Sequence, residues 1–69
     1  METMEIVVNG ESREVPPAIN LAELLQILDL PSDRVAVELN RAIIGRDRWA
    51  ATALHNQDRL EIVHFVGGG

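Results

Sequence analysis

The segment from Met4 to Asn9 has an apolar residue at every second position, which is typical of a strand with one buried face. It is followed by Asn9-Gly10, the dipeptide that most readily takes the positive φ angles of a two-residue hairpin turn. The segment from Glu11 to Val15 is polar enough for an edge strand, and two prolines end it because proline cannot donate to a sheet ladder. The pattern therefore predicts a hairpin from Met4 to Val15.

The period of the apolar positions then changes from that of a strand to that of a helix. Asn20 suits the N-cap of a helix, and Glu23, three positions later, is placed for a capping box. The residue before a proline is driven out of helical geometry, so Pro31 indicates the far end. We predict a helix from about Asn20 to Asp29, with a stripe of leucines facing the core. These leucines are Leu21, Leu24, Leu25 and Leu28.

The middle of the chain predicts a second pair of strands. Apolar residues return to every second position from Arg34 to Asn40, which favours a strand. The segment from Asn40 to Ala42 allows a turn, and Ile43-Ile44 then forms a short strand. We interpret Arg46 to Ala51 as a single helical turn or an irregular connection, in which Trp49 packs partly against the small core.

The last strand has the clearest pattern in the sequence. It is predicted from Arg59 to Val66, after a turn at His55 to Asp58. Its alternation points Leu60 and Ile62 inward and leaves Val63 and Phe65 on the other face.

The predicted order is strand, strand, helix, strand, short strand, strand, so one main helix packs on one face of a mixed sheet of about five strands. This is the order of the ubiquitin-like β-grasp, an α+β fold. We expect a single domain over residues 1–66 and a flexible glycine tail at residues 67–69. The N-terminal hairpin and the last strand would lie centrally, so that the chain leaves the sheet as an extended tail.

Composition and charge narrow the function classes. A chain of 69 residues with 46% hydrophobic residues can bury one modest core, and the absence of cysteine excludes disulfides, thiolate nucleophiles and cysteine zinc sites. The two histidines, His55 and His64, lack metal-site spacing, so we expect no metal site. A net charge of −5 argues against nucleic acid and favours a protein partner with a basic face. With no apolar run near the roughly 20 residues of a membrane span, we expect a cytoplasmic protein without membrane contact.

The end of the chain carries the strongest chemical signal. Gly67, Gly68 and Gly69 directly follow the last strand, and glycine backbone approaches another molecule more closely than any other residue's because it has no Cβ. Val66 to Gly69 would reach roughly 13 Å, at about 3.3 Å per residue, which is enough to enter a partner's pocket. The terminal carboxylate would then be the working group. The alternative interpretation is a frayed end, which most domains possess.

The sequence resembles the ThiS family of sulfur carriers in bacterial thiamin biosynthesis, from about Met4 to the last residue. The resemblance rests on the order of several short motifs and on the glycine ending. These motifs are Val37-Glu38-Leu39-Asn40, Ile43-Ile44-Gly45-Arg46, Asp58-Arg59-Leu60-Glu61-Ile62 and the tail from Val63 to Gly69.

The resemblance implies a protein co-substrate rather than an enzyme, with no catalytic residue and no cofactor of its own. A ubiquitin-activating-like adenylyltransferase of the ThiF type, using ATP and magnesium, would adenylate the carboxylate of Gly69. Sulfur from a persulfide donor would then give a thiocarboxylate, which a thiazole synthase of the ThiG type would use. Val66, Gly67 and Gly68 would thread into the partner sites.

Val7, Val63 and Phe65 form a candidate docking patch on the sheet face opposite the helix; the other interpretation is that they are scattered exposed apolar residues, which are common. Two further functions stay open. The small subunit of molybdopterin synthase has the same fold and tail chemistry but supplies sulfur to a pterin. A plain β-grasp interaction module would have an inert tail, and ATP-dependent modification of Gly69 separates it from a carrier.

Overall fold

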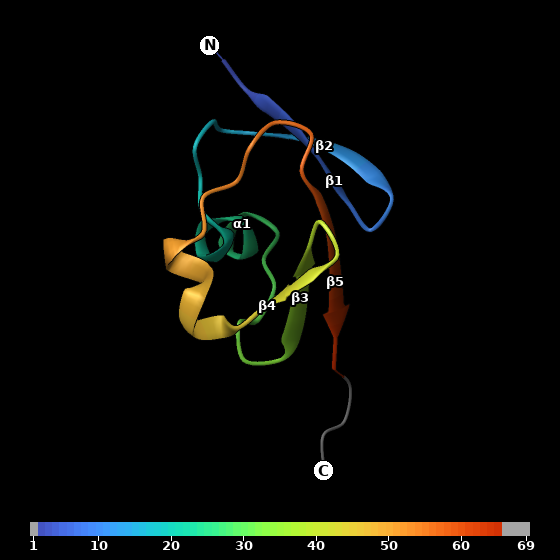
Figure 1. Ribbon diagram of the computed structural model, residues 1–69, viewed down its shortest axis with the longest axis vertical. Helices are drawn as coiled ribbons and strands as arrows, with labels where there is room; N and C mark the ends of the chain where they lie inside the picture. The colour runs from blue at the N-terminus through green and yellow to red at the C-terminus, as the bar shows by residue number, and fades with distance from the viewer. Residues whose placement is uncertain (1, 66–69) are drawn as a thin grey trace.

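The computed structural model describes residues 2–65, which form one mixed sheet with helices on one side of it (Figure 1). The strand order is β2-β1-β5-β3-β4, and only the β1–β5 pair is parallel. The elements are β1 (Met4–Val8), β2 (Glu11–Val15), α1 (Leu21–Ile27), β3 (Val35–Leu39), β4 (Ala42–Ile44), the 3-10 helix η1 (Arg46–Ala51) and β5 (Arg59–His64). This arrangement confirms the predicted α+β β-grasp fold.

The N-terminal hairpin turns where the sequence predicts it. Asn9 and Gly10 both have positive φ angles, of 50° and 84°, as a two-residue hairpin turn of this kind requires. The hairpin as a whole is not central, because only β1 lies inside the sheet. The polar strand β2 forms the edge, as its sequence favours.

The start of α1 confirms the predicted capping box. The side-chain oxygen of Asn20 accepts a hydrogen bond from the Glu23 N–H at 2.8 Å, and the Glu23 carboxylate accepts one from the Asn20 N–H at 2.9 Å. Two of the N–H groups that a helix start leaves unpaired are thereby satisfied.

The end of α1 falls two residues before the predicted one, at Ile27 instead of Asp29. Asp29 is in the left-handed region, with φ of 58°, and its N–H donates to the Gln26 carbonyl. The Leu30 N–H donates to the Leu25 carbonyl, which completes a Schellman motif. The left-handed Asp29, rather than the proline beyond it, therefore ends the helix.

The core lies between the sheet and the helices, and no polar or charged residue is buried among residues 2–65. Trp49 is only 3% exposed, so its burial is complete rather than partial, and its Nε1–H donates to the Ile44 carbonyl at 2.9 Å. Among the leucines of the predicted stripe, Leu28 is half-buried at the edge of the core. The buried residues are Met4, Ile6, Val8, Val15, Ile19, Leu21, Leu24, Leu25, Val35, Val37, Trp49, Leu54, Leu60 and Ile62.

Strand β5 ends at His64, so Phe65 is not part of it, contrary to the prediction, and Val66, the predicted last residue of the strand, lies outside the described residues. His64 lies opposite Val35, the first residue of β3, so β3 has no further residue with which β5 could pair. The Phe65 N–H still donates to the Arg34 carbonyl at 2.7 Å, which keeps Phe65 beside the start of β3. Within residues 2–65 no helix has the length and apolar character needed to cross a membrane.

The capping box should contribute measurably to stability. Replacing Asn20 with alanine removes the side-chain acceptor of the Glu23 N–H, and we expect the free energy of unfolding to fall by about 1 kcal/mol. Urea denaturation followed by circular dichroism measures this. Asn20→Asp keeps an acceptor and should lose less than about 0.5 kcal/mol; equal losses in the two variants would contradict this role of the cap.

Candidate functional site

The sheet face turned away from α1, here called the outer face, is not covered by the helices (Figure 1). Its residues follow from the strand alternation, because the opposite set of side chains is buried in the core. They are Glu5, Val7, Ser12, Glu14, Ala36, Glu38, Ile43, Arg59, Glu61 and Val63.

One end of the outer face is apolar. Ile43 is 80% exposed and Val63 57%, and Phe65, which follows Val63 by two positions and so continues the outward alternation of β5, is 54% exposed. Val63 lies opposite Ala36 in the β3–β5 register, and Ala36, Ile43 and Val63 line one shallow hollow of about 160 Å³. We call Ala36, Ile43, Val63 and Phe65 the apolar patch. Phe65 is the last described residue before the tail, so the patch adjoins the point where the tail begins.

The structure places the three predicted patch residues differently. Val63 and Phe65 lie in the apolar patch, but Val7 is half-buried and pairs with Arg59, four positions before Val63 on β5. Four positions along a strand correspond to about 13 Å. Ile43, which the sequence analysis assigns only to a short strand, takes the place expected for Val7. Its signal was the pair Ile43-Ile44, because alternation in a strand must turn one of the two outward.

Beyond the apolar patch, the outer face carries four glutamates and one arginine, Arg59. Two pairs of glutamates lie directly opposite each other, Glu5 with Glu14 and Glu38 with Glu61, and like charges in this position destabilise a sheet. In the first pair, the Glu5 carboxylate accepts a hydrogen bond from Gln57 and the Glu14 carboxylate accepts one from Thr3, so each has an uncharged donor.

The second pair, Glu38 and Glu61, adjoins the apolar patch and has no ion-pair or hydrogen-bond partner for its carboxylates among residues 2–65. Next to the apolar patch, Glu38 and Glu61 line a separate hollow together with Arg41 and Arg59. Neither arginine has a nitrogen within 4.0 Å of a carboxylate oxygen of these glutamates. A basic side chain from outside the chain, placed between Glu38 and Glu61, would relieve their repulsion. The outer face therefore fits a partner that presents an apolar contact beside a positive charge.

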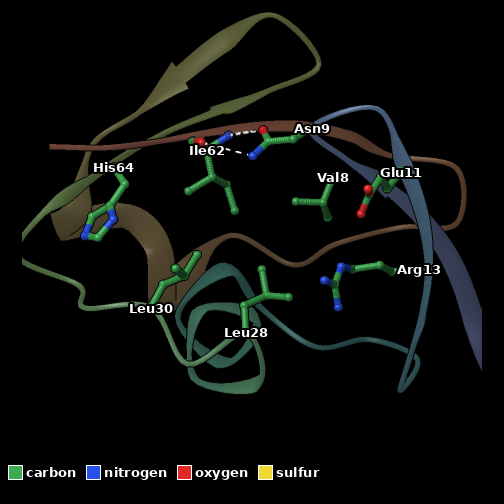
Figure 2. Close-up of a pocket in the computed structure, with 8 residues that line it drawn as sticks. All are labelled: Val8, Asn9, Glu11, Arg13, Leu28, Leu30, Ile62 and His64. Carbon is green, nitrogen blue, oxygen red and sulfur yellow. Dashed lines mark hydrogen bonds between the residues drawn. The ribbon is translucent and has the colours of Figure 1, made fainter. Parts of the chain in front are cut away.

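A second hollow, of about 250 Å³, lies on the helix side between the end of α1 and the β1–β2 hairpin (Figure 2). Val8, Ile62, Leu28 and Leu30 form its apolar walls, and polar side chains lie around it. It is smaller than the roughly 300 to 1,000 Å³ of typical ligand pockets. Glu11 and Arg13 are charged side chains on the inner face of an edge strand, an arrangement that discourages pairing with another chain.

No constellation of catalytic or metal-binding residues is found in the part of the chain that the structure describes. Residues 2–65 contain no group of three histidine, aspartate or glutamate side chains that could hold a metal ion. His64 is exposed at the end of β5. The predicted sulfur acceptor Gly69 and the predicted threading residues Val66, Gly67 and Gly68 lie outside the described residues.

The chain is similar to known proteins over nearly its whole length. The model of the ThiS family matches residues 6–69. A sulfur carrier protein ThiS of Bacillus subtilis is 45% identical over 49 residues, which cover 71% of this chain and 74% of that protein. The crystal structure of a thiamine biosynthesis protein (ThiS) from Geobacter metallireducens superposes with a TM-score of 0.83 at 35% identity, covering 96% of this chain and 100% of that one.

Longer proteins also contain a region similar to this chain. A thiazole synthase of Magnetococcus marinus is 39% identical over 66 residues, which are 96% of this chain but only 20% of that protein. The chain thus spans about a fifth of the length of such relatives. The family match, the relatives and the shared fold agree, and they confirm the resemblance seen in the sequence. This chain belongs to the ThiS family.

Proposed function

We propose that this chain is a sulfur carrier whose Gly69 carboxylate is adenylated and then converted to a thiocarboxylate for the thiazole moiety of thiamin. The observation that carries the proposal is the family match, which extends through the glycine tail to residue 69. The Bacillus subtilis relative, named as a sulfur carrier protein, supports it. In this proposal the chain would be a co-substrate of partner enzymes and not an enzyme itself, and the need for ATP favours the cytoplasm as its location.

The chemistry explains why a glycine carboxylate serves. A carboxylate resists nucleophilic attack, so it must first receive a good leaving group. An oxygen of Gly69 therefore attacks the α-phosphorus of ATP, pyrophosphate leaves, and an acyl-adenylate is formed. The outer sulfur of a persulfide then attacks the acyl carbon, AMP leaves with that oxygen, and a thiol cleaves the sulfur–sulfur bond to free the thiocarboxylate. An activating enzyme of the ThiF type would bind ATP and magnesium and stabilise the charge. The carrier supplies an accessible carbonyl and a surface that binds the enzyme.

The outer face is the proposed docking surface for these partners. The apolar patch supplies desolvated contact area, and Glu38 with Glu61 supplies the charge that steers a basic partner. The activating enzyme and a thiazole synthase of the ThiG type would use it in turn. Relatives named thiazole synthase contain a region similar to this chain, which favours a thiazole over a pterin as the destination of the sulfur.

The tail can be tested by adding a side chain at Gly68. The wild-type protein should support ATP–pyrophosphate exchange by a ThiF-type enzyme, and Gly68→Val should reduce the exchange by at least about a hundredfold because the tail no longer reaches the α-phosphate in line. Glu2→Val adds the same side chain near the other end and should exchange normally. Normal exchange with Gly68→Val would contradict the proposal.

The apolar patch can be tested with a charge at Ile43. Because Ile43 is 80% exposed, Ile43→Asp should lower the thermal unfolding midpoint only slightly, through repulsion from Glu38 opposite it, while the Kd for the activating enzyme should rise at least about tenfold, or about 1.4 kcal/mol. Titration calorimetry measures the affinity. The matched control is Ile27→Asp, since Ile27 is 51% exposed on α1, on the other side of the sheet. If both variants bind as tightly as wild type, the outer face is not the docking surface.

The pair Glu38–Glu61 should favour binding at the expense of stability. Removing one charge with Glu38→Gln should raise the free energy of unfolding by about 0.2 to 0.5 kcal/mol at low salt, and this gain should shrink at high salt. The same variant should associate more slowly with a basic partner in stopped-flow measurements. Glu11→Gln, on the inner face of β2, removes a charge without relieving this pair. A loss of stability in Glu38→Gln would refute the repulsion.

A further inference from the structure

The last strand is held on two sides along only part of its length. On one side, β3 pairs with β5 from Leu60 through His64. On the other side, the parallel register with β1 includes only Arg59 and Leu60, because the chain turns away at Asn9. Beyond Leu60 the backbone of β1 is no longer available to β5.

The side chain of Asn9 continues the pairing where the backbone of β1 stops. Its Nδ2–H donates to the Ile62 carbonyl at 3.1 Å, and its Oδ1 accepts from the Ile62 N–H at 2.7 Å, as Figure 2 shows. The Asn9 backbone N–H donates to the Leu60 carbonyl at 2.9 Å. A side-chain amide has the donor and acceptor of a peptide group, so it can replace one rung of the ladder. We call the two side-chain hydrogen bonds to Ile62 the Asn9 clamp.

Within residues 2–65, the Asn9 clamp contains the last hydrogen bonds that join β5 to the β1 side of the sheet. After Ile62, β5 is held by β3 through the Val63 and His64 pairs and the hydrogen bond from the Phe65 N–H to the Arg34 carbonyl. Val63 and Phe65, which belong to the apolar patch, lie in this one-sided segment. If the Asn9 clamp opens, residues 63–65 can separate more easily from β3, and the unpaired segment that ends at Gly69 becomes longer.

We propose that Asn9 is a positioning residue that fixes where β5 ends and therefore where Gly69 is presented to the activating enzyme. The inference rests on the proposed function for its kinetic consequence. A longer and looser arm lowers the effective concentration of its end at a partner site and widens the range of its orientations. Asn9 acts through Ile62 and needs no contact with ATP or with the carboxylate.

Asn40, in the turn between β3 and β4, provides a matched control because its side chain contacts the other end of β5. It has the same left-handed φ of 50° as Asn9. Its Oδ1 accepts from the Arg59 N–H at 3.0 Å, and its Nδ2–H donates to Asp58 Oδ1 at 3.0 Å. Its side chain therefore also makes two hydrogen bonds, one to Arg59 at the start of β5 and one to Asp58, the residue just before the strand. Glycine accepts positive φ, so Asn9→Gly and Asn40→Gly each remove two side-chain hydrogen bonds without straining the turn.

The experiment compares these two variants with wild type by hydrogen exchange and by steady-state ATP–pyrophosphate exchange. In Asn9→Gly we expect the Phe65 amide to exchange roughly tenfold faster than in Asn40→Gly, since only the Asn9 clamp adjoins the one-sided segment. In Asn9→Gly the kcat of pyrophosphate exchange should fall by about tenfold, while the KM for the carrier stays within about twofold of wild type. The reason is that Ile43 still binds the enzyme, whereas Gly69 is presented less accurately. Thermal unfolding of both variants shows that they are folded at the assay temperature.

A second variant keeps the test decisive if Asn9→Gly does not fold. Asn9→Asp keeps an acceptor for the Ile62 N–H but places a carboxylate oxygen, instead of the donor, against the Ile62 carbonyl, so it should change both measurements in the same direction as Asn9→Gly. Equal Phe65 exchange in the Asn9 and Asn40 variants, or equal losses of kcat, overturns the proposal and leaves Asn9 a structural residue only. A wild-type protein that supports no pyrophosphate exchange refutes the proposed function instead, and the hydrogen exchange comparison still decides whether Asn9 holds the end of β5.

Discussion

The pairing of β5 with both β1 and β3 is the interaction on which the rest of the structure depends. It joins an N-terminal hairpin and a strand pair from the middle of the chain into one sheet, although neither half pairs directly with the other. It also brings Leu60 and Ile62 under the leucines of α1, so the core closes around this strand. Because β5 is the last element within residues 2–65, the same pairing holds Phe65, the last described residue, beside the start of β3.

The two faces of β5 have different roles. Leu60 and Ile62 on the inner face are buried, which stabilises the fold, whereas the outer face places Glu61 against Glu38 and leaves Val63 uncovered. Neither outer feature helps the isolated chain, since like charges repel and exposed valine gains nothing from burial. Both become favourable against a partner with an apolar and basic surface. The outer face thus has the properties of a binding surface, and it begins where the tail begins.

The sequence predicts best those features that neighbouring residues decide. The turn at Asn9-Gly10 and the capping box of Asn20 with Glu23 depend on local backbone chemistry, and the structure confirms both. The ends of elements were predicted less well, because Asp29 and His64 end their elements through contacts and conformations that apolar periodicity does not encode. The place of Ile43 in the apolar patch depends on strand order. The Asn9 clamp pairs residues more than 50 positions apart, and no local pattern indicates it.

The central claim is that sulfur is carried on the carboxylate of Gly69, and mass spectrometry of the C-terminal fragment tests it most directly. The protein would be incubated with a ThiF-type enzyme, ATP and a persulfide donor, and then cleaved. Oxidation of Met1 or Met4 nearly matches the replacement of oxygen by sulfur in nominal mass, so the change must be localised by fragmentation. The account predicts sulfur in place of oxygen at Gly69, dependent on ATP. An unmodified Gly69, with an enzyme and donor that modify another member of the ThiS family, would contradict it.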